Sequence, residues 1–316
     1  MRVAVLDDYQ NVALVSADWW SVLSKAEVIT FCDHCSDNEI LKDRLQDMDV
    51  IVLMRERTPI GADLLDNLPN LKLIVTTGPS NAVVDVGKAR ENGVIVCGTG
   101  GYIEQTVELT WSLILGVARN IVEEVNAVRN GRWQVGIGTD LNKKTLGIVG
   151  LGRIGSGVAA VGKAFGMRVI AWSENLTDER AQDVGVERVS KSELFEQSDF
   201  VTLHLVLSER TKGIVGQSEI DVMKESSFII NTSRGPLIDE LSLIASLSDQ
   251  RIGGAALDVF DQEPLPEDHP FRSLPNVLAT PHIGYVTKET YQLFFDEIIQ
   301  DINAFLDGKP IRIVSV

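Results

Sequence analysis

The stretch from Thr145 to Asn175 constrains the fold more than any other part of the chain. It holds, in order, the apolar run Thr145–Val149, the glycine turn Gly150-Leu151-Gly152-Arg153-Ile154-Gly155, a helical pattern ending near Phe165, and the apolar run Arg168–Ser173. A strand, a GxGxxG turn, a helix and a second strand within about 30 residues form the context in which such a turn binds a dinucleotide.

Each glycine of this turn has its own physical reason. Gly150 permits a tight turn out of the strand, Gly152 allows a pyrophosphate to approach the backbone, and Gly155 lets the helix pack closely on the strand. The phosphates would meet free amide groups at the positive end of the helix. A purely structural turn is the alternative, and the correct flanking strands favour the nucleotide.

The composition is that of an ordinary globular protein and limits the partners. The 316 residues are 44% hydrophobic and carry a net charge of −16, which disfavours nucleic acid and anionic lipid. No apolar run reaches the roughly 18 residues of a membrane span. The first ten residues, MRVAVLDDYQ, are acidic where a signal peptide needs its apolar core. We therefore expect a cytoplasmic protein.

The three cysteines do not suggest a disulfide framework. Cys32 and Cys35 flank His34 in a CxxC pattern, whereas Cys97 lies far along the chain. The pattern is open to a redox pair or half of a zinc site, but no second CxxC or CxxH follows. We favour incidental thiols at a strand end and expect no bound metal.

The first 98 residues alternate between strand and helix. Strand-like runs occur at Val3–Leu6, Val28–Phe31, Val50–Met54, Leu71–Thr76 and Val94–Cys97, with helical or turn segments between them such as Asp37–Gln46 and Gly61–Asn67. This alternation is typical of a parallel sheet covered on both faces. It predicts a five-stranded, flavodoxin-like domain.

A long helical pattern, Tyr102–Asn130, follows without an internal proline. Leu109, Leu113, Val117 and Ile121 fall on or near one face, and Gly131 supplies a stop. We expect one helix that crosses from the first α/β unit to the second.

The second α/β unit runs from Thr145 to about Ile283. After the two strands already named, further strands are predicted at Val186–Val189, Phe200–Leu205, Phe228–Asn231, Gly254–Val259 and Val277–Thr280. An amphipathic helix, Lys288–Leu306, ends at Asp307-Gly308 and could return to the first domain. The fold class is thus α/β, with two doubly wound parallel-sheet domains.

Three polar stretches follow predicted strands of this second unit. They are Asn231–Pro236 (NTSRGP), Ala256–Pro264 (ALDVFDQEP) and Thr280–Gly284 (TPHIG). Parallel strands end at one edge of a sheet, so Arg234, Glu263 and His282 should reach the edge that holds the nucleotide. Taken singly, they could be a surface cation, a solvated acid and a structural histidine. Their occurrence together at one edge of the sheet makes those interpretations less favoured.

Four motifs in order, GLGRIG, NTSRG, DVFDQEP and PHIG, resemble the D-isomer-specific 2-hydroxyacid dehydrogenase family. The similarity covers nearly the whole chain, including TTGPSN and LTWSLILGVAR. It implies a smaller substrate or lid domain built from both termini and a larger Rossmann-type NAD-binding domain. We place the boundaries at residues 1–98 with 289–316, and 99–288. The resemblance also implies a homodimer through the nucleotide domains.

The resemblance implies Arg234, Glu263 and His282 as the catalytic set. The resemblance implies NAD as the cofactor, with Asp258 bonded to the nicotinamide carboxamide. The predicted cofactor-binding residues are Gly150, Gly152, Arg153, Ile154, Gly155, Ser173, Glu174, Leu205, Thr232, Asp258 and Gly284. Predicted substrate contacts are Arg234, His282, Arg55, Gly78, Pro79 and Ser80. The chain is expected to transfer hydride between NAD(H) and a small 2-oxo acid or D-2-hydroxy acid resembling glyoxylate, hydroxypyruvate or phosphoglycerate.

Two alternatives remain open. Some proteins that resemble this family are nucleotide-sensing corepressors, but no basic cluster resembling a nuclear signal is present. Formate dehydrogenases of the superfamily carry Gln where this chain has Glu263. Turnover of 2-oxo acids separates the first alternative from an enzyme.

The chain also departs from the family pattern. Ser173, followed by Glu174, stands where an Asp usually contacts the adenosine ribose, and Lys143 replaces a usual glycine. The sequence stops at Val316, where many phosphoglycerate dehydrogenases continue into a regulatory extension. We expect a preference for NADH of about tenfold, or about 1.4 kcal/mol, with Arg180 in a helix that faces away from the cofactor.

Overall fold

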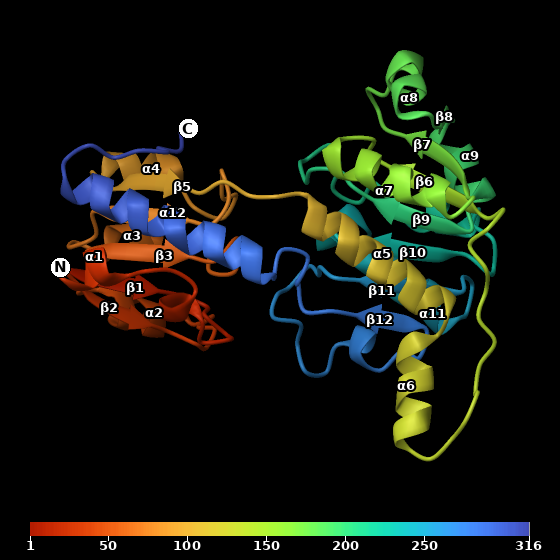
Figure 1. Ribbon diagram of the computed structural model, residues 1–316, viewed down its shortest axis with the longest axis horizontal. Coiled ribbons are helices and arrows are strands. Elements are labelled where there is room, and N and C mark those ends of the chain that lie inside the picture. Colours follow the sequence, from red (N-terminus) through yellow and green to blue (C-terminus); the bar gives the residue numbers. More distant parts are fainter. Residues whose placement is uncertain (316) are drawn as a thin grey trace. The chain divides into compact units, whose positions relative to one another are not determined.

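The computed structural model describes residues 1–315, which form two compact units (Figure 1). Unit 1 comprises Met1–Tyr102 together with the chain from Val286 onward, and unit 2 comprises Ile103–Tyr285. Each unit contains one parallel sheet with helices on its faces. The prediction of two doubly wound α/β domains is confirmed.

The sheet of unit 1 has five strands in the order β2-β1-β3-β4-β5, all parallel. The strands are β1 (Arg2–Val5), β2 (Glu27–Thr30), β3 (Val50–Leu53), β4 (Leu73–Thr76) and β5 (Ile95–Gly98). The central strands β3 and β4 are buried throughout because helices cover both faces. This is the flavodoxin-like order that the alternation predicts.

The helices of unit 1 are α1 (Trp20–Leu23), α2 (Asn38–Leu45), α3 (Ala62–Asp66), α4 (Val86–Glu91) and α12 (Lys288–Leu306). The α12 helix begins after Thr287, whose hydroxyl accepts from the Thr290 amide, and buries Phe294, Phe295 and Ile298. Figure 1 shows it running along the unit 1 sheet. The apolar face of α12 therefore returns the chain's last helix to the unit in which the chain begins.

The sheet of unit 2 has seven parallel strands in the order β12-β11-β10-β9-β6-β7-β8. They are β6 (Thr145–Val149), β7 (Arg168–Trp172), β8 (Glu187–Arg188), β9 (Phe200–Leu203), β10 (Phe228–Asn231), β11 (Gly254–Leu257) and β12 (Val277–Ala279). The order reverses between β6 and β9, and a dinucleotide binds at such a switch point in this fold.

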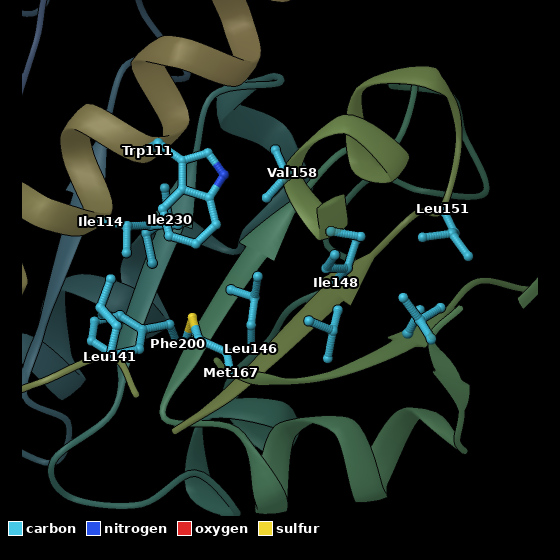
Figure 2. Packing of buried hydrophobic residues seen from close by; sticks show 14 of the residues in the cluster. Trp111, Ile114, Leu141, Leu146, Ile148, Leu151, Val158, Met167, Phe200 and Ile230 are labelled. Carbon is cyan, nitrogen blue, oxygen red and sulfur yellow. The ribbon is translucent and has the colours of Figure 1, made fainter. Parts of the chain in front are cut away.

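Two apolar clusters lie on the faces of this sheet. One joins α5 (Glu104–Ala118) and α7 (Arg153–Ala164) to the strands, and Figure 2 shows Trp111 and Val158 facing Leu146 and Ile148 there. The other packs α9 (Lys191–Gln197), α10 (Gln217–Asp221) and α11 (Glu240–Ser248) against the opposite face through Phe195, Leu243 and neighbours. The remaining helix, α8 (Asp178–Val184), contributes Ala181 to the first cluster.

The prediction of one long helix between the units is wrong. The segment forms α5 and α6 (Ile121–Arg129), separated at Asn120, which has a left-handed φ of 50°. Asn tolerates this conformation better than most residues and so ends α5. The α5 helix packs on β10, β11 and β12 and lies wholly within unit 2, so it does not cross between the units.

Lys143 also adopts a left-handed backbone, with φ of 66°. The conformation that a glycine would supply is thus kept although the glycine is absent, at a cost of about 1 kcal/mol or more. Within residues 1–315, no helix is both long and apolar enough to cross a membrane.

Candidate active site

The glycine turn has the geometry that a phosphate requires. Gly150 has a φ of 101°, and a side chain there would meet the His204 carbonyl oxygen at 2.7 Å. A Cβ on Gly155 would collide with the Gly150 carbonyl, so the helix packs directly on the turn. Nothing lies within 4 Å of a Cβ built on Gly152, which caps α7. The open position beside a helix N-terminus fits a pyrophosphate.

Leu205 follows β9 and lies beside this turn. Its side chain would be 2.9 Å from a Cβ on Gly150, and the His204 amide bonds the Val149 carbonyl. Burial lowers the pKa of His204 to about 3, so that imidazole is neutral. The predicted cofactor residue Leu205 therefore lies at the β6/β9 switch point, next to the uncharged imidazole of His204.

Arg234 lies in a loop that β10 carries to the same sheet edge. Asn231 bridges the loop, because its amide donates to the Arg234 carbonyl at 2.8 Å and its oxygen accepts from the Ser233 amide at 3.0 Å. The guanidinium Nη1 donates to the Ser233 carbonyl at 2.7 Å. Thr232, predicted at the cofactor, instead pairs its buried hydroxyl with that of Thr110 on α5, at 2.8 Å.

Gly235 explains why glycine follows the arginine. A Cβ on Gly235 would collide with the backbone of Phe260 and Asp261, so the arginine loop presses on the loop that leads to Glu263. Two of the predicted catalytic residues are thus on loops in direct backbone contact. Apart from the glycine itself, no feature of the sequence indicates this contact.

His282 and Glu263 form a close pair. The His282 Nδ1 lies 2.6 Å from Glu263 Oε2, and the other carboxylate oxygen accepts from the Phe260 amide at 2.9 Å. Both side chains are partly exposed, at 17% and 27%. His282 has a left-handed φ of 52°, and its ring meets Tyr285 edge-on at 5.5 Å. With Nδ1 held by the carboxylate, Nε2 is the nitrogen left for a ligand.

Asp258 holds the backbone of the histidine loop. Its carboxylate accepts from the Thr280 hydroxyl at 2.6 Å and from the amides of Ile283 and Gly284, each at 2.8 Å. Burial raises the pKa of Asp258, and these donors act against that rise. Asp258 therefore fixes the backbone on both sides of His282, through Thr280 before it and through Ile283 and Gly284 after it. Asp258 and Gly284 are both predicted cofactor residues. Thr280 was not predicted, and only the three-dimensional fold brings it to Asp258.

The ribose end of the predicted cofactor site differs from expectation in one respect. Ser173 is partly buried after β7, and Glu174 is exposed. Arg180, expected to face away, instead donates from Nη2 to the Ser156 hydroxyl in the first turn of α7, at 2.9 Å. That expectation is wrong because α8 packs beside α7, which the sequence does not indicate.

The predicted substrate residues of unit 1 follow β3 and β4. Arg55 has a φ of 52°, its amide donates to the Thr77 hydroxyl at 2.8 Å, and its guanidinium lies against Gly78. The Gly78 amide already donates to the Thr99 hydroxyl at 2.8 Å. Pro79 and Ser80 are exposed, and proline has no amide hydrogen to donate.

His34 of the CxxC stretch belongs to a different arrangement. Its Nδ1 lies 2.9 Å from Oδ1 of Asp7, and the Asp7 Oδ2 accepts from the Thr58 hydroxyl at 2.6 Å. Cys32 is exposed, and Cys35 donates weakly to the Asp37 carbonyl. The histidine is therefore engaged by a buried carboxylate rather than by the thiols.

Comparison with known proteins gives a consistent result. Residues 111–284 match the family model for the D-isomer specific 2-hydroxyacid dehydrogenase, NAD binding domain. A glyoxylate reductase of Aeropyrum pernix is 37% identical over 282 residues, covering 86% of this chain and 84% of the relative. A glycerate dehydrogenase of Methylorubrum extorquens is 36% identical, covering 88% of each. The crystal structure of a Vibrio cholerae phosphoglycerate oxidoreductase superposes with a TM-score of 0.93 at 38% identity, covering 98% of this chain and 99% of that one.

Proposed function

Because the chain belongs to the D-isomer specific 2-hydroxyacid dehydrogenase family, we propose that Arg234, Glu263 and His282 reduce a small 2-oxo acid to its D-2-hydroxy acid. The chain is an NAD-linked oxidoreductase that interconverts 2-oxo and 2-hydroxy acids, as the family and its relatives show. The roles of single residues and the choice of substrate are the proposal.

The observation that carries the assignment is the 2.6 Å contact between His282 Nδ1 and Glu263 Oε2. The carboxylate fixes the ring, so Nε2 can deliver a proton to the oxygen that develops negative charge at C2. The Phe260 amide holds the second oxygen of Glu263 and keeps the carboxylate in place. In the oxidation direction the same nitrogen accepts the hydroxyl proton.

Arg234 is proposed to bind the substrate carboxylate. A guanidinium donates two parallel hydrogen bonds to a planar carboxylate and also polarises a neighbouring carbonyl. The support is the braced loop, in which Asn231 fixes the backbone on both sides of Ser233. In a chain of net charge −16, an anionic substrate requires such a local cation. Arg55 and the Ser80 amide stay predicted substrate contacts.

The glycine turn is proposed to bind the pyrophosphate of a nicotinamide cofactor, with Gly152, Arg153 and Ile154 nearest the phosphates. Its support is the open space at Gly152 and the close packing at Gly155. When bound, the cofactor supplies or accepts the hydride at C2. Leu205 would border the cofactor, and Asp258 would present its remaining lone pairs toward the carboxamide. Because Thr110 uses the Thr232 hydroxyl, Thr232 would contact the cofactor through its backbone or methyl group.

We propose NADH as the preferred reductant, by about tenfold. The support is the exposed acid Glu174 beside Ser173, since a carboxylate at the ribose repels a 2′-phosphate. Replacing Ser173 by Asp should sharpen the preference for NADH, and Glu174→Arg should move the preference toward NADPH. The ratio of kcat/KM for NADH and NADPH measures both effects.

A screen of NADH oxidation over 2-oxo acids tests the function. Glyoxylate and hydroxypyruvate are the first candidates, since relatives are named glyoxylate reductase and glycerate dehydrogenase. Turnover that vanishes in His282→Gln is the expected result. Failure of every 2-oxo acid under conditions where NADH binds would contradict the proposal. The alternative of a corepressor-like nucleotide sensor is not favoured by the relatives, which are enzymes.

We also infer a cytoplasmic homodimer. Its support is the apolar surface of α6 and the loop after it, where Val125, Val128 and Trp133 are exposed and Ile137 is 97% exposed. A second copy of the chain would cover such a surface. Light scattering on the purified protein measures the state, and Val128→Glu should yield monomer.

A further inference from the structure

The adenosine end of the site has an unusual combination of side chains. In this fold the residue that follows the second strand of the nucleotide domain contacts the ribose, and an acid there repels a 2′-phosphate. Here that residue is Ser173, which repels nothing, and the acid comes one residue later at an exposed position. The 2′-phosphate of NADPH therefore meets only weak repulsion at this end of the site.

Arg180 brings a positive charge to the same end. It belongs to α8, which follows β7, and its Nη2 donates to the Ser156 hydroxyl at 2.9 Å. Ser156 immediately follows Gly155 and lies in the first turn of α7, the helix that begins at the glycine turn. The guanidinium is thus held at the first turn of α7.

The charge of Arg180 is not neutralised by a neighbour. Among residues 1–315 no carboxylate lies within ion-pair distance of Arg180, and the hydroxyl of Ser156 leaves its charge intact. The nearby cations differ, because Arg188 pairs with Asp178 at 3.2 Å and Arg168 with Glu187 at 2.7 Å. In a chain with 45 acidic and 29 basic residues, a cation left unpaired beside a nucleotide site is available to an anionic ligand.

We propose that Arg180, held by Ser156, binds the 2′-phosphate of NADPH and thereby keeps the preference for NADH small. The inference rests on the proposed nucleotide site. A planar guanidinium matches a phosphate and forms two charge-assisted hydrogen bonds with it, whereas the 2′-hydroxyl of NADH gives little electrostatic gain. Arg180 is therefore a specificity-determining residue that acts on one cofactor and not on the other.

The test measures cofactor binding by the intact protein without any 2-oxo acid. Fluorescence titrations give the Kd of NADH and NADPH, and competition by 2′,5′-ADP against 5′-ADP isolates the 2′-phosphate. Arg180→Gln should weaken NADPH by about tenfold, equal to about 1.4 kcal/mol, and change NADH by less than about twofold. Added salt should weaken NADPH more than NADH in the parent and less so in the variant.

Two further variants decide between charge and packing. Ser156→Ala keeps the guanidinium but releases it, so NADPH should weaken by about threefold. Arg188→Gln removes a nearby paired cation and should leave both affinities unchanged. If Arg180→Gln weakens NADH and NADPH equally, or changes neither, the assignment is overturned. A protein that binds both cofactors with this ratio but reduces no 2-oxo acid would contradict the proposed function alone.

Discussion

Two carboxylate–histidine pairs, His282–Glu263 in unit 2 and His34–Asp7 in unit 1, differ in what surrounds the carboxylate. In unit 2, Glu263 is 27% exposed and holds His282 with one oxygen and a backbone amide with the other. In unit 1, Asp7 is 1% exposed and accepts from His34, the Tyr9 hydroxyl and the Thr58 hydroxyl. The same pair of groups thus lies at a partly exposed sheet edge in unit 2 and in a buried hydrogen-bond network around Asp7 in unit 1.

The difference shows how burial divides chemistry from structure. Asp7 has a left-handed φ of 56° and ties together the loops after β1, β2 and β3, so its partners are other parts of the fold. Buried polar groups of this kind are costly to disturb because each lost partner stays unsatisfied. Glu263 has fewer protein partners and leaves the His282 ring partly exposed. We therefore expect rate effects from the unit 2 pair and stability effects from the unit 1 pair.

The largest expected effect separates the two histidines. His282→Gln should lower kcat by about 10²–10⁴-fold, the scale of a lost general acid. His34→Gln should leave kcat in the parent range and reduce the free energy of unfolding by about 1–2 kcal/mol. Steady-state kinetics and urea unfolding on both variants provide the measurement. Equal losses of rate would break the contrast between the pairs.

Replacing Arg234 tests the proposed substrate-binding cation at the sheet edge that carries the His282–Glu263 pair. Arg234→Lys should lower kcat/KM for the oxo acid by about 10–100-fold, because a hydrogen bond to a charged group contributes about 1.5–3 kcal/mol. Both kcat and KM should change. Arg168→Lys, at the start of β7, is the matched control and should have parent kinetics. A loss confined to cofactor affinity would move Arg234 to the nucleotide site.

Replacing Asp7 tests how much its buried hydrogen-bond network contributes to stability. Asp7→Ala leaves the Thr58 and Tyr9 hydroxyls and the His34 ring without their acceptor, so the free energy of unfolding should fall by about 1–3 kcal/mol. Glu263→Ala should cost less than about 1 kcal/mol, since its carboxylate is partly solvated. Urea midpoints compare the two. A larger cost for Glu263 would show that the unit 2 pair is the structural one.

Asp301 extends the contrast to another buried acid of unit 1. Burial raises the pKa of this carboxyl to about 7, although Arg312 lies 3.1 Å away. Its unfolded pKa is near 3.9. Between these two pKa values the folded protein keeps a proton that the unfolded chain has lost. The contribution of Asp301 to the free energy of unfolding is therefore fully present below about pH 4 and is lost as the pH rises toward 7.

Asp301→Asn should remove that pH dependence. The difference in unfolding free energy between pH 5 and pH 8 should shrink by about 2–3 kcal/mol, while kcat stays at the parent value. Thermal unfolding at the two pH values is the measurement. A parent protein that becomes more stable across this range would show that Arg312 dominates and that the carboxyl is ionised throughout.

Local patterns in the sequence determined the elements and the identity of the reactive groups. The run from Thr145 to Val149, the glycine turn and the helix after it follow from short-range constraints, because strand burial, turn φ and helix packing each require particular residues within a few positions. The last helix, Lys288–Leu306, is also predicted to the residue from its apolar spacing and its ends. Arg234, Glu263 and His282 stand out because each follows a buried strand.

Only the tertiary structure decided which groups meet. The Asn120 break, the bond of Arg180 to Ser156 and the pairing of His34 with Asp7 depend on contacts that sequence spacing does not encode. Hydrogen bonds between residues tens of positions apart form only where packing brings loops together, as Gly235 does for the arginine and glutamate loops. The sequence therefore specified the chemical groups. Long-range packing determined which histidine can reach a substrate, because packing leaves Glu263 at a partly exposed edge and buries Asp7.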